Sequence, residues 1–81
     1  MTMSQYLAAF HTHLSALRSH RALQQANVAA RLAPVPREIS SSCGTCVRYE
    51  SDSPCESLLD AELEAVFLVS DRQYRQLIVR E

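Results

Sequence analysis

The stretch from Pro34 to Cys46 limits what this chain can fold into more than any other part of it. Pro34 and Pro36 have no backbone N–H and cannot donate to a β-ladder. Three consecutive serines and the only glycine of the chain, Gly44, follow them. We therefore expect Val28 to Val35 to be an edge strand, or a strand that ends here, and to lead rigidly into a serine-rich loop.

The chain before this loop predicts a strand and then a helix. Ser4 to Phe10 is short and apolar, which favours a strand, and Thr12 stands where a helix N-cap is expected. From His13 to Ala26 apolar residues recur at helical spacing, which is typical of an amphipathic helix. Asn27 fits the left-handed position that ends such a helix. The expected apolar stripe of the helix consists of Ala16, Leu17, His20 and Leu23.

The chain after the loop predicts a strand from Cys46 to Glu50 and a second helix. The residues Ser53-Pro54-Cys55-Glu56 have the pattern of a capping box with proline at the first helical position. An apolar stripe at helical spacing then favours a helix to about Ser70, followed by a last strand from Tyr74 to Arg80. The stripe contains Leu59, Leu63, Val66, Phe67 and Ser70.

An alternative interpretation of the same residues stays open. Ala65 to Ser70 is apolar and partly β-branched, so it also fits a strand, and Asp71 to Val79 would then be a terminal helix. We prefer the first interpretation.

The order strand, helix, strand, strand, helix, strand predicts an α+β fold of the ferredoxin-like split βαβ type (βαββαβ). This fold is a four-stranded sheet containing antiparallel pairs, with two helices on one face. A right-handed first crossover makes strands 4–10 and 28–35 parallel, which brings the Cys43 loop close to His11, Thr12 and His13. Cys55 is expected at the other end of the sheet, roughly 16 Å away at about 3.3 Å per strand residue.

Length and charge narrow the function classes. With 81 residues, of which 47% are apolar, we expect one globular domain over residues 1–81. The formal net charge is −1 and the basic residues are scattered arginines, so a nucleic acid partner is not expected.

The N-terminus has no secretory signal pattern and no apolar run is long enough to span a bilayer, so a cytoplasmic protein without a membrane partner is expected. Three cysteines without an export signal are then more typical of reduced, reactive or metal-bound thiols than of a disulfide framework.

The loop gathers the groups that could activate a thiol. A thiolate is the nucleophilic form of cysteine, so a reactive cysteine needs positive charge or hydrogen-bond donors nearby. Candidate groups for Cys43 are the guanidinium groups of Arg37 and Arg48, the backbone amides around Gly44, the hydroxyls of Ser40, Ser41 and Ser42, and, from the expected topology, His11 and His13.

Cys43 and Cys46 also have the spacing of a redox disulfide, in which one thiol attacks and the other resolves. As half of a zinc site the pair lacks a second pair of cysteines, although His11 and His13 could complete one. We expect no metal.

The run Pro36-Arg37-Glu38-Ile39-Ser40-Ser41-Ser42-Cys43-Gly44 resembles the signature of a family of small bacterial proteins described as selenium/sulfur carrier-like (DUF3343). The resemblance extends to Phe10-His11 at the end of the first strand, to the alanine-rich helix and to an arginine five residues after the cysteine, here Arg48. It implies that Cys43 holds sulfur or selenium as a persulfide or perselenide.

We therefore expect a small carrier protein rather than an enzyme, without a resident cofactor. It would accept sulfur or selenium on Cys43 from a donor such as a cysteine desulfurase-like protein and pass it to an acceptor protein. Two alternatives remain, a thiol-disulfide redox protein that uses Cys43 and Cys46, and a non-catalytic interaction or regulatory module.

Overall fold

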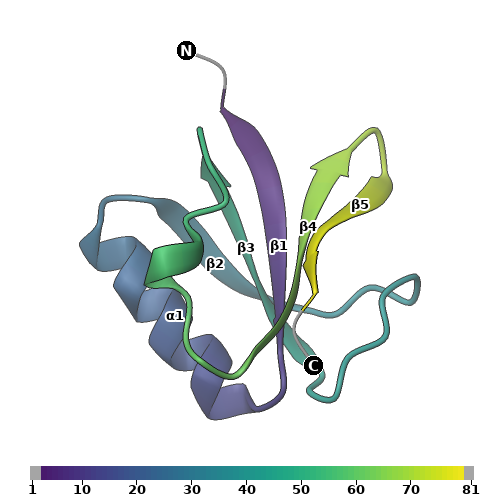
Figure 1. The fold of residues 1–81 in the computed structure, drawn as a ribbon, viewed down its shortest axis with the longest axis horizontal. Helices are drawn as coiled ribbons and strands as arrows, with labels where there is room; N and C mark the ends of the chain where they lie inside the picture. The colour runs from purple at the N-terminus through teal and green to yellow at the C-terminus, as the bar shows by residue number, and fades with distance from the viewer. Residues whose placement is uncertain (1–2, 80–81) are drawn as a thin grey trace.

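The computed structural model describes residues 3–79, which form one antiparallel sheet covered on one face by a helix (Figure 1). The elements are β1 (Ser4–Phe10), α1 (His13–Gln25), β2 (Ala29–Pro34), β3 (Thr45–Ser51), the 3₁₀ turn η1 (Glu56–Leu58), β4 (Leu63–Ser70) and β5 (Gln73–Val79). The strand order is β2-β3-β1-β4-β5, and every neighbouring pair is antiparallel. No helix among residues 3–79 has the length and apolar character needed to cross a membrane.

The predicted ferredoxin-like fold with four strands and two helices is wrong. The described chain has five strands and one α-helix. Its first half follows the expected order, since β1 and β2 are both antiparallel to β3 and so run in the same direction on either side of it. β2 is an edge strand that ends at Pro34, as the prolines predicted. The difference begins after β3.

The predicted second helix does not form, either at its expected N-terminus or along its expected apolar stripe. Cys55 has the left-handed backbone angles φ 54° and ψ 39° and makes no side-chain cap, so only the single 3₁₀ turn η1 forms. Leu63 to Ser70 is a strand that lies between β1 and β5. Because both faces of this strand are covered, its apolar run does not alternate with polar residues and resembles a helical stripe. The alternative interpretation is therefore correct for Ala65 to Ser70.

The last strand is β5, and the alternative terminal helix is wrong. A two-residue turn joins β4 to β5, with φ 49° at Asp71 and φ 65° at Arg72. Positive φ at both central residues is the pattern of the type I′ turn, whose twist matches that of a hairpin. Arg80, the predicted end of the strand, lies outside the described residues.

Each face of the sheet has its own apolar cluster. We call the larger cluster, between the sheet and the layer of α1 and η1, the helix-side core; its buried members are Tyr6, Ala8, Phe10, Ala16, Leu23, Val47, Tyr49, Leu59, Leu63 and Val66. We call the smaller cluster on the opposite face the loop-side core; its buried members are Leu7, Ile39 and Cys46, with Ala33, Val35, Phe67, Val69 and Tyr74 packed around them.

The buried face of α1 agrees with the predicted stripe at Ala16 and Leu23 and differs from it at Leu17. Ser15 and Ser19 are buried, whereas Leu14 and Leu17 are 54% and 40% exposed. The Ser15 hydroxyl donates to the Asp60 carboxylate (2.7 Å), and the Asp60 amide donates to the Ser19 hydroxyl (2.8 Å). These bonds tie the segment after η1 to the helix, and the bond from Ser15 is the main reason why the pKa of Asp60 lies below its usual value.

The ends of α1 follow the sequence closely. The Thr12 hydroxyl accepts from the Ser15 amide (3.1 Å) as the N-cap, and Asn27 takes the left-handed conformation with φ 63°. His20, in the middle of α1, is half-buried, and its Nε2 donates to the carbonyl of Ala30 on β2 (3.3 Å). The predicted helix boundaries are thus correct to within one residue.

Candidate functional site

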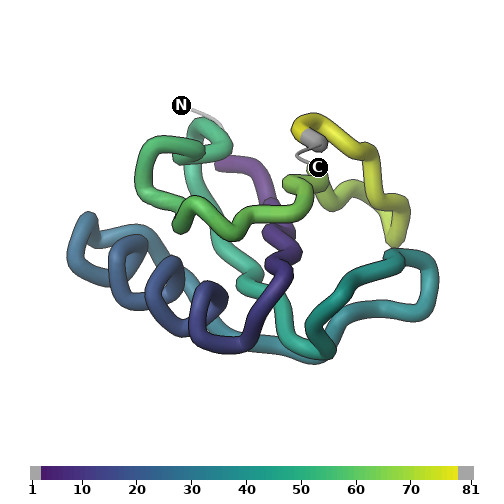
Figure 2. Tube along the Cα trace, turned by 60° about the horizontal axis from the view of Figure 1, so that its bottom comes forward, coloured from purple at the N-terminus to yellow at the C-terminus, as the bar shows by residue number. Residues whose placement is uncertain are grey.

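The loop between β2 and β3 is closed at its base and lies on the side of the sheet away from α1 (Figure 2). The Val35 amide donates to the Gly44 carbonyl (3.2 Å), which joins the two ends of the loop. Within the loop the Ile39 amide donates to the Pro36 carbonyl (3.1 Å). The Ile39 side chain is buried in the loop-side core against Leu7 and Cys46. One apolar side chain therefore fastens the loop to the sheet.

Glu64 on β4 holds the part of the loop just before Cys43. Its carboxylate accepts from the hydroxyls of Ser41 (2.9 Å) and Ser42 (3.0 Å) and from the Ser42 amide (3.2 Å). The Ser41 hydroxyl also lies within hydrogen-bonding distance of the Phe10 carbonyl (3.3 Å) and accepts from the Cys43 amide (3.3 Å). The backbone that carries Cys43 is therefore positioned by a carboxylate from a strand distant in sequence.

Sequence reasoning missed Glu64. The available signal was a lone acidic residue inside the apolar run from Leu63 to Val69, where an unpaired carboxylate would be costly. Burial raises the pKa of Glu64, but the hydrogen bonds from Ser42 and Ser41, together with the nearby His11, outweigh it and keep the pKa below its usual value. Glu64 is thus favoured in its charged form.

The loop lies beside the start of α1, which confirms the placement expected from parallel β1 and β2. His11 Nδ1 is 3.7 Å from the Glu64 carboxylate, and His13 Nδ1 is 3.2 Å from the Thr45 hydroxyl at the end of the loop. Both imidazoles therefore contact groups that hold the loop, and His11 retains 36% of its side-chain exposure.

The two loop cysteines lie in different environments. Cys43 is half-buried and Cys46 is fully buried, at 0% exposure, in the loop-side core. Burial raises the pKa of the Cys46 thiol, although Arg48 and Arg31 oppose this effect. The Cys46 thiol also lies 3.7 Å from the Pro34 carbonyl, to which it can donate. Cys46 is therefore held as a packed thiol, and Cys43 is the accessible one.

Cys55 lies at the opposite end of β3, as predicted. Cys43 comes before β3 and Cys55 comes after it, so the whole strand of 7 residues, about 23 Å at about 3.3 Å per residue, lies between them. The Cys55 sulfur contacts the hydroxyls of Ser51 (3.3 Å) and Ser53 (3.7 Å). All three cysteines are free thiols.

The remaining candidate groups are arranged differently from the expectation of a ring of donors around sulfur. The Ser41 and Ser42 hydroxyls donate to Glu64. Arg48 donates to the Tyr74 hydroxyl (3.2 Å) and stacks over its ring at 5.8 Å. The Arg37 side chain of the loop is exposed and has no hydrogen-bond or ion-pair partner among residues 3–79.

Gly44 does not use the positive φ that was expected to let nearby amides converge, and a Cβ built at this position meets no atom within 4 Å. Ser40, the other expected hydroxyl donor, is exposed. In the part of the chain that the structure describes, no three His, Cys, Asp or Glu side chains are grouped as metal ligands.

Residues 5–64 match the profile of the family described as "Putative Se/S carrier protein-like". This chain belongs to that family. The matched range contains the whole loop, its three anchoring residues Ser41, Ser42 and Glu64, and all three cysteines. Almost all of the β4–β5 hairpin, which begins at Leu63, lies outside the match.

One curated relative matches part of the chain. The chain is 31% identical over 45 residues to the uncharacterized protein YtiA of Escherichia coli (strain K12), and the aligned stretch is 56% of this chain and 53% of the relative. The match thus spans about half the length of that relative. No solved structure matches this Se/S carrier-like chain.

Proposed function

We propose that this protein carries sulfur or selenium on Cys43, as a persulfide or perselenide, and passes it to a partner protein. The observation that carries the proposal is the contrast between the two loop thiols, since Cys43 is accessible while Cys46 is buried with a raised pKa. The family description points to the same class of cargo. In this proposal the cargo is bound covalently and transiently, and the protein is a carrier rather than an enzyme.

Loading is a transfer of one chalcogen atom between sulfurs. The Cys43 thiolate attacks the outer atom of a donor persulfide or perselenide and forms a new bond to it. The bond between that atom and the donor sulfur breaks, and the donor leaves as a thiolate with the electron pair. Cys43 then holds the terminal atom, and no external oxidant or reductant is consumed. A cysteine desulfurase-like protein is the class of donor that presents such a group, and attack by an acceptor thiol repeats the same step.

The site favours a single working thiol over a reversible disulfide. Attack on sulfur requires a thiolate, and burial of Cys46 disfavours that form. Cys46 also contributes a full side chain to the loop-side core, so moving it toward Cys43 would remove packing from Leu7 and Ile39. His11, His13 and Glu64 act in this proposal as groups that hold the loop in position around Cys43.

Intact-protein mass spectrometry tests the proposal. The reduced protein is incubated with a cysteine desulfurase and either cysteine or selenocysteine, and the mass gain is located by peptide mapping. We expect a gain of one sulfur or one selenium atom on Cys43, which persists in Cys46→Ser and disappears in Cys43→Ser.

Cys55→Ser is the matched control, because it removes a partly exposed thiol at the other end of β3 and should load normally. A loss of two hydrogen atoms in mass, seen only when both Cys43 and Cys46 are present, would indicate a disulfide and would favour the redox alternative. No change of mass in any variant would leave only an interaction module and would contradict the carrier proposal.

A further inference from the structure

A pair of arginines faces the same side of the sheet without an acidic partner. Arg31 on the edge strand β2 lies directly opposite Arg48 on β3 in the antiparallel register. Arg48 is two residues from Cys46, so both arginines project from the loop-side face. Like charges directly opposite each other across two strands destabilise a sheet. Within residues 3–79 no carboxylate forms an ion pair with either guanidinium.

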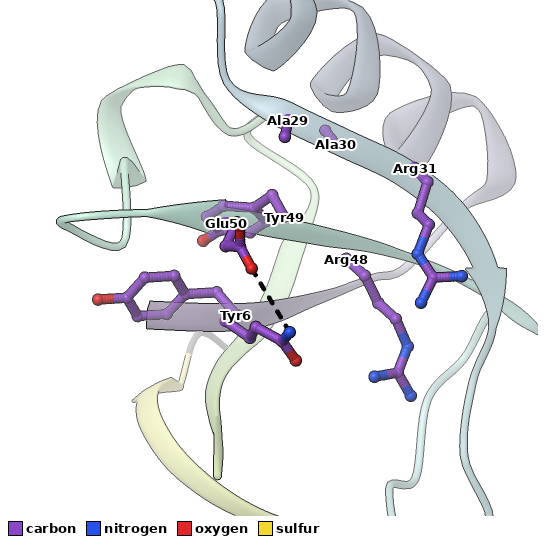
Figure 3. Close-up of a pocket in the computed structure, with 8 residues that line it drawn as sticks. Tyr6, Ala29, Ala30, Arg31, Arg48, Tyr49 and Glu50 are labelled. Carbon is purple, nitrogen blue, oxygen red and sulfur yellow. Dashed lines mark hydrogen bonds between the residues drawn. The ribbon is translucent and has the colours of Figure 1, made fainter. Parts of the chain in front are cut away.

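Arg31 and Arg48 both line a pocket of about 280 Å³ (Figure 3). Figure 3 shows both side chains extending from neighbouring strands in the same direction. Glu50 also borders this pocket, but its carboxylate accepts from Gln5 on β1 (3.5 Å) and so is turned away from β2. The pocket therefore carries an excess of positive charge.

Arg48 is held in place before any ligand binds. One of its terminal nitrogens donates to the Tyr74 hydroxyl (3.2 Å), and its guanidinium lies 5.8 Å from the centre of the Tyr74 ring. A guanidinium has five N–H donors, so most of those on Arg48 remain available. A fixed arginine loses less side-chain entropy when it binds a ligand.

We propose that Arg31 and Arg48 form a binding site for a tetrahedral oxyanion, either free phosphate or the phosphate group of a small organic molecule. Two planar guanidinium groups can each present paired N–H donors to such an anion. The pocket volume of about 280 Å³ leaves room beyond a single anion. A bound anion would also remove the repulsion between the two arginines. This site is independent of chalcogen loading on Cys43.

The test is a titration of the full chain with inorganic phosphate and, separately, with glycerol 3-phosphate. The backbone amide chemical shifts are recorded by NMR and the unfolding temperature is measured at each ligand concentration. We expect saturable shifts in β2 and β3 around Arg31 and Arg48 and a higher unfolding midpoint as ligand is added. Binding of inorganic phosphate alone would identify a free anion as the ligand. Tighter binding of glycerol 3-phosphate would identify a small organic phosphate. Either result supports the site.

Single substitutions distinguish binding at this site from non-specific attraction of the anion to positive charge. Arg31→Gln and Arg48→Gln should each weaken binding about tenfold or more, because each removes charge-assisted hydrogen bonds. Arg31 is exposed, so its replacement should leave the fold intact, and without phosphate the variant should unfold at the same or a higher temperature. Arg21→Gln is the matched control, since it makes the same charge change on the exposed face of α1 and should leave binding unchanged.

Glu50→Gln should tighten binding, because it removes the negative charge at the border of the pocket. Weaker binding in this variant would indicate a zwitterionic ligand and overturn the proposal. The absence of any saturable shift in the wild-type protein would overturn it as well, and so would an equal loss of binding in Arg21→Gln.

Discussion

The two faces of the sheet are covered in different ways. The helix-side core is sealed by α1 and by the segment around η1, and it contains Phe10, the largest fully buried side chain of the described residues. The loop-side core has three buried residues, and one of them, Ile39, comes from the loop itself. The larger core thus lies on one face of the sheet, and the loop that carries Cys43 packs on the other. Loops that carry function commonly rest on a rigid scaffold in this way.

Truncation of a helix-side residue should have the largest effect on stability. Phe10→Ala removes a fully buried aromatic ring at the end of β1 and should lower the free energy of unfolding by about 3–5 kcal/mol. Chemical denaturation followed by circular dichroism measures this change. A loss under about 1 kcal/mol would mean that the helix-side core does not dominate stability.

Truncation of Ile39 should have a smaller and more local effect. Ile39→Ala removes the side chain that fastens the loop, and we expect a loss of about 2 kcal/mol, at the low end for buried aliphatic residues, because the loop can relax into the space. The variant should also let an alkylating reagent reach Cys46, which is shielded in the wild type. A loss equal to that of Phe10→Ala, with Cys46 still protected, would show that the two faces do not differ as described.

Replacement of Glu64 tests the polar anchor of the loop. Glu64→Gln weakens the charge-assisted bonds from Ser41 and Ser42 and should cost about 1–2 kcal/mol. The hydrogen-exchange rate of the Ser42 amide, which donates to Glu64, should increase in the same variant. Glu62→Gln, the same change at an exposed position of the adjoining segment, should leave both quantities unchanged.

The same anchor predicts a pH dependence. The folded pKa of Glu64 lies below its ordinary value of 4.5, so the native state favours the charged carboxylate. Its contribution to stability is complete well above pH 4.5 and is lost as the pH falls through the lower folded pKa. The chemical shift of the Ser42 amide, measured by NMR, should change with pH in that acidic range in the wild type. If the chemical shift of the Ser42 amide still changed over the same pH range in Glu64→Gln, a titratable group other than Glu64 would be the cause.

The smallest effect is expected at Gly44. Because Gly44 has no positive φ and a Cβ there meets no neighbour within 4 Å, Gly44→Ala should be neutral or stabilise by up to about 1 kcal/mol through the unfolded state. Thermal unfolding provides the measurement. A clear loss of stability would mean that the loop needs a conformation that only glycine adopts.

The sequence predicted the first half of the fold because its signals there are local. Thr12 and Asn27 mark the two ends of α1 through side-chain and backbone preferences that act within a few residues. The prolines likewise marked the end of the edge strand β2. These preferences also allowed the position of the Cys43 loop to be predicted. The helix between β1 and β2 implied that the two strands are parallel, which places the loop beside the start of α1.

The second half could not be predicted in the same way because its determinants are tertiary. β4 is covered on both faces, so the alternation that identifies a strand is absent. The turn at Asp71 and Arg72 lacks the glycine that usually signals a type I′ hairpin. Glu64 is recognisable as a loop anchor only once β4 is known to pass beside Ser41 and Ser42.

The closed base of the loop has a kinetic consequence. The contacts that hold residues 35–44 are the bond between Val35 and Gly44, the Ile39 side chain and the Glu64 carboxylate, and none of them belongs to a β-ladder. The loop can therefore open as a unit while the five strands stay paired, with a free energy below that of global unfolding. How long the buried Cys46 thiol stays shielded from solvent is then set by the rate at which this loop opens and closes, and not by the lifetime of the folded sheet.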